Sequence, residues 1–263
     1  MQKTLLVCSK STLKYLNDYD TAFVIPGPPT TEILNLKDTE TSVVAIGGGA
    51  VIDTAKIISS QPIICYPTTA AGAACTSHSV CWDGNKKKSI KGLMPKEVHV
   101  VEEFVKDLPA CIKEETTYDA LSHCLDSMWS KRKTRLSMMY VEEALEILEG
   151  SYSNCELVEA GNIAGKAIEI CPTTILHALS YPLTAHYGIS HGRALGFLLP
   201  GVCKFMNFDL EKYNRYQPIS IPDINCDFVA KKALQYNKIY DILKEVNCDV
   251  LVGVLNFSKE YKR

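Results

Sequence analysis

The segment Ser42–Lys56, with the sequence SVVAIGGGAVIDTAK, decides the fold class of this chain. Residues 42–46 are rich in β-branched and apolar side chains and predict a buried strand, and the residues after the three glycines predict a helix. Glycines at such a turn let a pyrophosphate approach the main chain, where the N–H groups of the new helix face its charge. A tight turn without a ligand needs glycine as well, and the spacing is not the G-x-G-x-x-G of the usual dinucleotide fingerprint. The segment therefore predicts an α/β layer with a candidate phosphate-binding turn.

Short β-rich runs continue this pattern along the first hundred residues. Turn residues separate them, which is the rhythm of a parallel α/β layer. Strands are predicted at Thr4–Val7, Ala22–Ile25, Thr41–Ile46, Pro62–Tyr66 and Val98–Glu102.

From Leu108 onward the pattern changes to long helical periods, with Pro109 at the change. We therefore expect two domains, an α/β domain over residues 1–107 and an all-helical domain over residues 108–263. Helices are predicted at Glu114–Trp129, Lys133–Glu149, Glu156–Glu169, Asp227–Tyr236 and Lys238–Val246.

The composition is that of a soluble globular protein. The 263 residues are 46% hydrophobic and 22% charged, with a formal net charge of -2, which gives no electrostatic footprint for nucleic acid or an anionic membrane. No apolar run is long enough to span a bilayer, and the start of the chain does not resemble a signal peptide, so we expect a cytoplasmic protein. The eleven cysteines are scattered without a C-x-x-C pair, which predicts neither a zinc knuckle nor a disulfide framework.

Two further segments could face a ligand. The loop Pro67–Thr76, after a predicted strand, is built of small and hydroxyl residues that could line a nucleotide, although a flexible loop has the same composition. The run Asp83–Lys91, with the sequence DGNKKKSIK, is a turn followed by basic residues. It is either a solvated loop or a segment that faces an anion.

Four residues in the helical half have the chemistry of a metal site. Asp119 and His123 are four positions apart and therefore lie on one helix face. His177 and His191 lie in apolar helical segments, where a single histidine is more often part of the core. One carboxylate and three imidazoles together form a ligand set for a divalent transition metal and leave room for a substrate oxygen. Iron(II) and zinc(II) both fit this set.

In order along the chain, these motifs resemble the iron-containing (group III) alcohol dehydrogenases. The resemblance runs from about Thr4 to Pro200 and rests on five features. It implies an α/β N-terminal dinucleotide-binding domain, an all-α C-terminal metal-binding domain of the dehydroquinate synthase-like type, and a nicotinamide in the cleft between them. The features are GGGAxxDxAK at 47–56, PTTA at 67–70, DALxH at 119–123, His177, and His191 followed by Gly192.

The resemblance also implies roles for individual residues. Fe(II) or Zn(II) would be held by Asp119, His123, His177 and His191. The cofactor would be bound by Ser9, Gly48, Gly49, Asp53, Thr68, Thr69 and Lys87.

Two departures from the family pattern refine these expectations. Many members end the first strand with Asp-Lys, where the carboxylate repels a 2'-phosphate; Ser9 and Lys10 stand here, which favours NADP over NAD. Members also commonly carry a second histidine four residues after the third metal ligand, and this chain has Tyr181 there. That segment resembles the subgroup that reduces phosphonoacetaldehyde to 2-hydroxyethylphosphonate. Tyr181 would be catalytic in a proton relay or would shape the pocket, and Arg193 could pair with a phosphonate.

The expected activity is reversible hydride transfer between NAD(P)H and a small aldehyde or primary alcohol, with a homodimer expected by family analogy. Three alternatives stay open. The first is a polyol dehydrogenase or a dehydroquinate-synthase-like cyclase of the same architecture. The second is a family member that binds nucleotide without catalysis, which the shortened ends of the chain suggest. The third is a structural or interaction protein that keeps only the fold.

Overall fold

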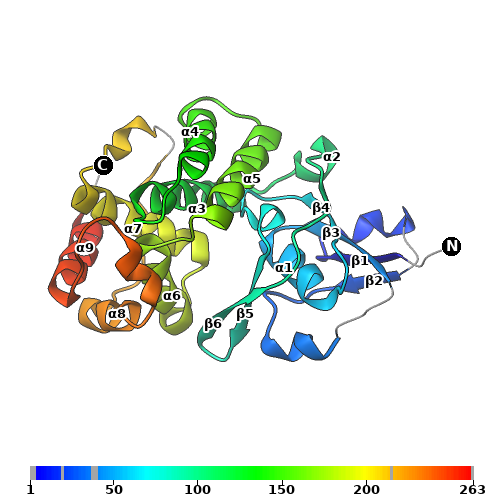
Figure 1. Cartoon of the computed structure of the whole chain (residues 1–263), viewed down its shortest axis with the longest axis horizontal. Coiled ribbons are helices and arrows are strands. Elements are labelled where there is room, and N and C mark those ends of the chain that lie inside the picture. Colours follow the sequence, from blue (N-terminus) through cyan, green and yellow to red (C-terminus); the bar gives the residue numbers. More distant parts are fainter. Residues whose placement is uncertain (1–3, 19–20, 37–40, 214–215, 262–263) are drawn as a thin grey trace.

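The sheet of the N-terminal half is parallel and has the order β2-β1-β3-β4-β7 in the described part of the chain. The computed structural model describes residues 4–18, 21–36, 41–213 and 216–261. Figure 1 shows this sheet on one side of the molecule and a cluster of helices on the other. The strands are β1 (Thr4–Cys8), β2 (Thr21–Val24), β3 (Ser42–Gly47), β4 (Ile64–Pro67) and β7 (Glu97–Val98).

Four of the five predicted strands are confirmed, with shifts of one or two residues at their ends. The fifth prediction, Val98–Glu102, is wrong beyond its first residue. Strand β7 ends at Val98 and helix α2 (Glu102–Val105) begins where the strand was expected to finish. Glu102 and Glu103 stand in the first turn of α2, where the positive end of the helix dipole favours acidic side chains.

Both faces of the sheet are covered. Helix α1 (Gly49–Ile58) follows β3 directly and packs Val51, Ile52 and Ala55 against Val7 and Ala45. A smaller apolar cluster on the strands is covered by Tyr15, Tyr66 and Phe104. The 3-10 helices Leu13–Asp18 and Thr31–Leu36 make two of the connections.

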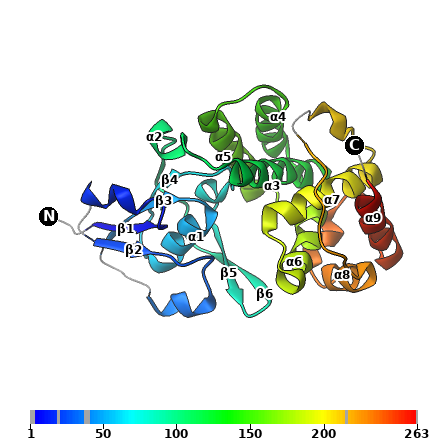
Figure 2. The same cartoon turned by 180° about the vertical axis from the view of Figure 1, so that it is seen from behind.

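The basic run Asp83–Lys91 belongs to a β-hairpin. Strands β5 (His78–Asp83) and β6 (Lys86–Lys91) are antiparallel and pair Asp83 with Lys86, so Gly84 and Asn85 form a two-residue turn. Gly84 has a φ of 54°, which suits glycine in such turns. Figures 1 and 2 both show the hairpin reaching from the α/β half toward α6 in the helical half. Neither sequence-based reading, a solvated loop or a loop that faces an anion, anticipated a strand here.

The helical half surrounds α3, which contacts α4, α5, α6 and α7 and contributes Leu121, Cys124 and Leu125 to a large apolar core. Helices α4 and α5 begin with capping boxes at Thr134 and Ser153. No helix in the described ranges is long and apolar enough to cross a membrane. The helices are α3 (Ala110–Trp129), α4 (Arg135–Glu149), α5 (Asn154–Ile170), α6 (Ile175–Tyr187), α7 (His191–Met206), α8 (Cys226–Ala233) and α9 (Cys248–Glu260).

The first three predicted helices are confirmed, and α8 confirms most of the fourth. The prediction of a helix at Lys238–Val246 is wrong. Residues Asn237–Asp241 form a 3-10 helix, and the backbone after it bonds to the end of α3, from Leu243 N to Trp129 O at 2.8 Å. This pairing with another element takes the hydrogen bonds that a helix would use.

Helix α5 joins the two halves. A Cβ atom on Gly161 would overlap the backbone of Ala70, and one on Gly165 would overlap the backbone of Gly72. The loop after β4 therefore lies directly against α5. At the end of the same helix, Glu169 accepts hydrogen bonds from the Ser77 backbone N–H at 2.9 Å and hydroxyl at 2.6 Å.

The domain boundary between residues 107 and 108 lies between β7 and α3 and stays a prediction.

Candidate active site

The four residues proposed as metal ligands lie together where α3, α6 and α7 meet. Asp119 and His123 come from α3, His177 from α6, and His191 is the first residue of α7. The Nε2 atoms of the three histidines lie 3.4, 3.5 and 3.7 Å from Oδ1 of Asp119, in that order. The rings of His123 and His177 stack with their centroids 4.7 Å apart. Three imidazole nitrogens therefore converge on one carboxylate oxygen.

The donor atoms of this cluster fit a divalent transition metal. Oδ1 of Asp119 and Nε2 of His177 are fully buried, and neither has a hydrogen-bond partner among the described residues. Buried polar atoms without partners are costly, and a bound cation would supply the missing interaction. Donor atoms of Asp119, His177 and His191 all lie within 4.8 Å of one another. His123 falls outside that set of three, although its Nε2 faces the same carboxylate oxygen.

Burial shifts the pKa values of all four side chains toward their uncharged forms. It raises the pKa of Asp119 to about 7, an effect that the nearby charge of Lys87 reduces. It holds the pKa values of His123, His177 and His191 well below their usual range. The imidazoles are therefore neutral at physiological pH and each offers a lone pair. The side chain of His191 is 31% exposed, against 3% for His177, so His191 marks the open side of the cluster.

Asp126 is a site residue that the sequence reasoning missed. Its Oδ2 lies 2.8 Å from Nδ1 of His177, and its Oδ1 accepts from the Thr174 hydroxyl at 2.9 Å and the Leu176 N–H at 3.1 Å. The carboxylate thus satisfies an otherwise unpaired N–H at the start of α6. The i, i+4, i+7 spacing of Asp119, His123 and Asp126 on one helix face was the signal available.

Tyr181 lies one turn after His177 on α6, between two lysines. The Nζ atoms of Lys87 and Lys238 lie 4.3 and 5.0 Å from the centroid of its ring, which stacks on His191 at 6.3 Å. Lys238 donates to the Tyr181 hydroxyl at 2.8 Å and to Thr173 Oγ1 at 2.7 Å. Burial alone would raise the pKa of Tyr181, but Lys238 and Lys87 outweigh it and lower that pKa.

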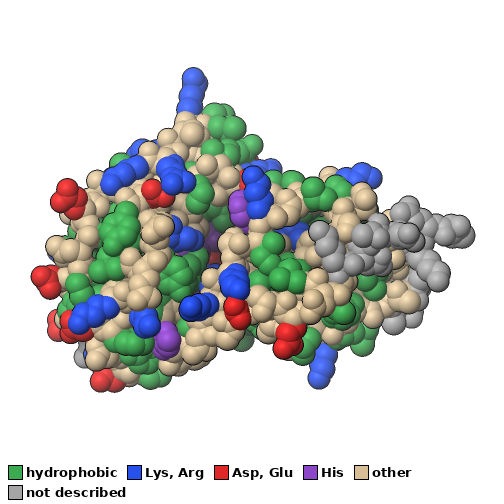
Figure 3. All heavy atoms as spheres, turned by 60° about the horizontal axis from the view of Figure 1, so that its bottom comes forward, with side chains coloured by type: hydrophobic (Ala, Val, Ile, Leu, Met, Phe, Trp, Pro, Cys, Tyr) green, Lys and Arg blue, Asp and Glu red, His purple; other side chains and the backbone are tan. Residues whose placement is uncertain are grey.

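Lysines, and not Arg193, are therefore the cations beside the cluster. Arg193 is exposed, and its guanidinium donates to the backbone carbonyl of Ser220 at 2.9 Å. Lys87 reaches the cluster because the β5–β6 hairpin extends across the junction of the two halves. Figure 3 shows basic side chains near the line where the halves meet.

The two glycine- and threonine-containing loops lie side by side at the carboxyl ends of β3 and β4. A Cβ atom on Gly48 would lie 3.1 Å from Oγ1 of Thr69, and one on Gly49 would lie 3.1 Å from Cβ of Ala71. The backbone N–H of Thr68 donates to the carbonyl of Gly47 at 3.0 Å. In parallel α/β sheets, ligands bind at this edge.

Ser9 lies at the same edge. Its N–H donates to Oγ1 of Thr12 at 3.0 Å, and the Thr12 hydroxyl donates to the carbonyl of Ile46 at 2.8 Å. These bonds join the turn after β1 to the end of β3. Ser9, Gly48, Gly49, Thr68 and Thr69 thus gather at one edge of the sheet, and their contact with a cofactor stays a prediction.

Asp53 has a different environment from the other proposed cofactor residues. Its carboxylate is buried, lies 3.3 Å from Nζ of Lys56, and accepts the Val80 N–H at 3.0 Å. Lys56 in turn donates to the carbonyl of Ala73 at 3.0 Å. This buried pair ties α1 to β5 and to the loop after β4. Nothing in this arrangement favours a contact between Asp53 and a cofactor.

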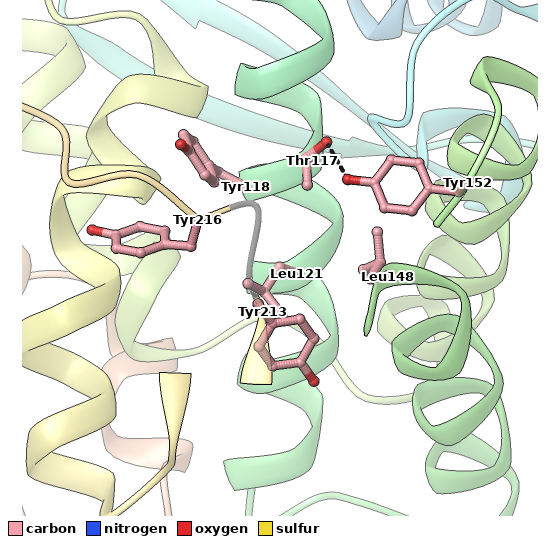
Figure 4. A pocket seen from close by; sticks show the side chains of 7 residues that line it. All are labelled: Thr117, Tyr118, Leu121, Leu148, Tyr152, Tyr213 and Tyr216. Carbon is pink, nitrogen blue, oxygen red and sulfur yellow. Dashed lines mark hydrogen bonds between the residues drawn. The ribbon is translucent and has the colours of Figure 1, made fainter. Parts of the chain in front are cut away.

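A pocket between α3, the end of α4 and the segment after α7 carries none of this chemistry (Figure 4). The hydroxyls of Tyr118 and Tyr213 are bonded to Glu114 at 2.8 Å and Glu149 at 3.3 Å. Its lining is Thr117, Tyr118, Leu121, Leu148, Tyr152, Tyr213 and Tyr216.

Residues 114–250 match the C-terminal model of the Fe-containing alcohol dehydrogenase family. The chain therefore belongs to this family, as the sequence motifs predicted, and the matched region contains all four residues of the carboxylate–histidine cluster.

Among curated proteins, the chain is similar to 4-hydroxybutyrate dehydrogenase of Clostridium kluyveri, with 28% identity over 214 residues that cover 64% of this chain and 57% of that protein. It is also similar to phosphonoacetaldehyde reductase of Streptomyces viridochromogenes, with 27% identity over 206 residues, 62% of this chain and 52% of that protein. The chain thus matches little more than half the length of these relatives.

Solved structures confirm the fold. An iron-containing alcohol dehydrogenase from Thermotoga maritima superimposes with a TM-score of 0.86 at 20% identity, over 99% of this chain and 92% of that one. Sulfoacetaldehyde reductase from Bifidobacterium kashiwanohense, solved in complex with NAD+, gives a TM-score of 0.85 at 20% identity, again over 99% and 92%. An α/β half followed by a helical half is therefore the architecture that the sequence predicted.

Proposed function

We propose that this chain catalyses reversible hydride transfer between a nicotinamide dinucleotide and an aldehyde or primary alcohol. The observation that carries the proposal is the convergence of three imidazole nitrogens on the buried Oδ1 of Asp119. Asp119, His123, His177 and His191 would hold Fe(II) or Zn(II). When bound, such an ion supplies Lewis-acid stabilisation of the charge that develops on the substrate oxygen.

The residues of the chain would bind the dinucleotide and the substrate and would orient the metal ligands. Gly48, Gly49, Thr68 and Thr69 would receive the dinucleotide at the sheet edge. Asp126 would orient His177. We place the domain boundary between residues 107 and 108. The α/β domain before it would hold the cofactor, and the helical domain after it would hold the metal and the substrate.

We assign NADP as the preferred dinucleotide. Ser9 follows β1 at the edge where a carboxylate would repel a 2'-phosphate, and Lys10 beside it adds a positive charge. Both residues are compatible with a phosphorylated ribose.

Phosphonoacetaldehyde is the first substrate to test, with 2-hydroxyethylphosphonate as product. Two curated relatives are named for 4-hydroxybutyrate and phosphonoacetaldehyde, compounds that carry an acid group. The two lysines beside Tyr181 support a substrate of that kind. We assign Tyr181 to the wall of the substrate site; a proton relay through its hydroxyl is the alternative role. A homodimer and a cytoplasmic location stay predictions.

Metal analysis tests this proposal first. The protein would be loaded anaerobically with Fe(II) or Zn(II), desalted and analysed beside His177→Ala and the control His186→Ala, which changes an exposed histidine on the same helix. We expect one tightly bound metal per chain in the wild type and the control, lost in His177→Ala. NADPH consumption with a panel of aldehydes should then follow metal content. Tight nucleotide binding without turnover of any aldehyde would contradict the proposal and favour a nucleotide-binding protein without catalysis.

A further inference from the structure

We propose that Lys238 and Lys87 bind the acid group of the substrate, and that Lys238 makes the enzyme prefer anionic over neutral aldehydes. This assigns Lys87 to the substrate, whereas the family resemblance implied a contact with the cofactor. The inference rests on the proposed function and deepens it, because it names the substrate class and the residue that selects it. Lys238 comes from the C-terminal 3-10 helix Asn237–Asp241, and Lys87 comes from β6 in the other half.

One ring brings the two cations and the metal cluster together. Lys87 and Lys238 lie 4.3 and 5.0 Å from the centroid of the Tyr181 ring, and His191 stacks on the same ring at 6.3 Å. Both lysines and the cluster therefore border the same ring. On this proposal, a short aldehyde with an acid group at its far end contacts the lysines and the cluster together.

The ammonium group of Lys238 is held in place with one donor to spare. An ammonium carries three N–H donors. In the described part of the chain, Lys238 uses two of them, toward Thr173 Oγ1 at 2.7 Å and the Tyr181 hydroxyl at 2.8 Å. Both partners are hydroxyl groups and neither is a carboxylate, so they orient the ammonium. A third donor remains for an oxygen of a ligand.

Neither lysine is paired with a carboxylate of the residues that the structure describes. No described aspartate or glutamate forms an ion pair with Lys87 or Lys238, whereas Lys88, next to Lys87, pairs with Asp83 at 2.6 Å. The charge of Lys87 lowers the pKa of Asp119, but that carboxylate faces the three imidazoles. Half-buried cations without a counter-ion are costly, and an anionic ligand would offset that cost.

The shared chemistry of the ligand is an oxyanion on a short aldehyde, either a phosphonate, a sulfonate or a carboxylate. Charge-assisted hydrogen bonds from ammonium groups suit all three anions. Phosphonoacetaldehyde, sulfoacetaldehyde and succinate semialdehyde therefore serve as the anionic arms of the test, and propanal and butanal serve as the neutral arms. The arm with the highest kcat/KM identifies the acid group.

The first measurement compares kcat/KM for these aldehydes in the metal-loaded wild type, Lys238→Gln, Lys238→Arg and the control Lys231→Gln, which changes an exposed lysine of α8. We expect Lys238→Gln to lose about tenfold or more with anionic aldehydes, the size of one charge-assisted hydrogen bond, and to change little with neutral ones. Lys238→Arg should recover part of the loss, and Lys231→Gln should match the wild type. Thermal melting of each variant confirms that it is folded.

The second measurement does not depend on turnover. Binding of methylphosphonate to the metal-loaded protein is titrated by calorimetry, and we expect Lys238→Gln to weaken it about tenfold. Equal binding by Lys238→Gln and wild type would overturn the inference, as would equal losses with anionic and neutral aldehydes.

The outcomes separate this inference from the proposed function. Turnover of neutral aldehydes with no preference for anions would leave the function standing and refute the anion site. Binding of methylphosphonate that depends on Lys238, without turnover of any aldehyde, would refute the function and leave the anion site standing.

Discussion

Oδ2 of Asp126 lies 2.8 Å from Nδ1 of His177 in the interior of the helical half. The same oxygen lies 3.3 Å from the backbone N–H of His177, a group that can only donate. The carboxylate therefore acts as an acceptor, and the proton of the imidazole belongs on Nδ1. The other nitrogen, Nε2, is left with its lone pair directed at the cluster around Asp119. Asp126 thus sets the tautomer that a metal ligand needs.

Replacing Asp126 by Asn tests that relationship. The amide can donate to Nδ1 and favour the tautomer with the proton on Nε2, so we expect metal affinity to fall by about 10- to 100-fold. Competition with a chelator of known affinity measures the change. Asp223→Asn, at an exposed aspartate paired with Lys259, should leave the affinity unchanged. Wild-type affinity in Asp126→Asn would show that the pair is dispensable for metal binding.

A second prediction concerns the contact between α5 and the loop after β4. A methyl group on Gly161 would overlap the backbone of Ala70, so Gly161→Ala should lower the free energy of unfolding by about 1–3 kcal/mol. Because the displaced loop carries Thr68 and Thr69, dinucleotide affinity should fall as well. Gly253→Ala is the matched control, since nothing lies within 4 Å of a Cβ atom there in α9. That change should be neutral or stabilise by up to about 1 kcal/mol. Equal stabilities of the two variants would refute the close approach.

The contact between Glu169 and Ser77 should make stability depend on pH. Burial raises the pKa of Glu169, but hydrogen bonds from Ser77 and His78 outweigh it and hold the pKa below its usual value. A carboxyl group with a lowered pKa in the folded state stabilises the protein above its unfolded pKa of about 4.3, and that contribution is lost as pH falls through the folded value. We expect Glu169→Gln to cost about 1 kcal/mol at neutral pH.

Urea unfolding of wild type and Glu169→Gln between pH 7 and 3 measures this dependence. The difference in unfolding free energy should shrink below about pH 4, where the wild-type carboxyl becomes protonated. Glu159→Gln, at an exposed position of the same helix, controls for the loss of one surface charge. A difference that stays constant across the range would mean that ionisation of Glu169 does not contribute.

The parts of the structure that follow local patterns could be predicted from the sequence. Periodicity located β1, β3, α3 and α5, and the i, i+4 spacing put Asp119 and His123 on one face. The meeting of His177 and His191 with that face depends on how α6 and α7 pack. Residue type and the family resemblance pointed to it, because local periodicity says nothing about how distant helices meet. Lys238 could not be predicted, because it reaches Tyr181 from a segment that looked helical and is instead bonded to the end of α3.

Tyr181→Phe separates the two roles left for this residue. The Tyr181 hydroxyl accepts a hydrogen bond from Lys238 at 2.8 Å, and the ring supports both lysines. We expect that Tyr181 shapes the site. In that case Phe keeps the ring but removes the hydrogen-bond acceptor that orients Lys238. The value of kcat/KM should then fall several-fold with anionic aldehydes and stay near that of the wild type with neutral ones. A proton relay would act on every substrate, and its loss would lower kcat by about 100-fold or more with both kinds of aldehyde. Steady-state kinetics with phosphonoacetaldehyde and propanal, on protein of equal metal content, decides between these roles.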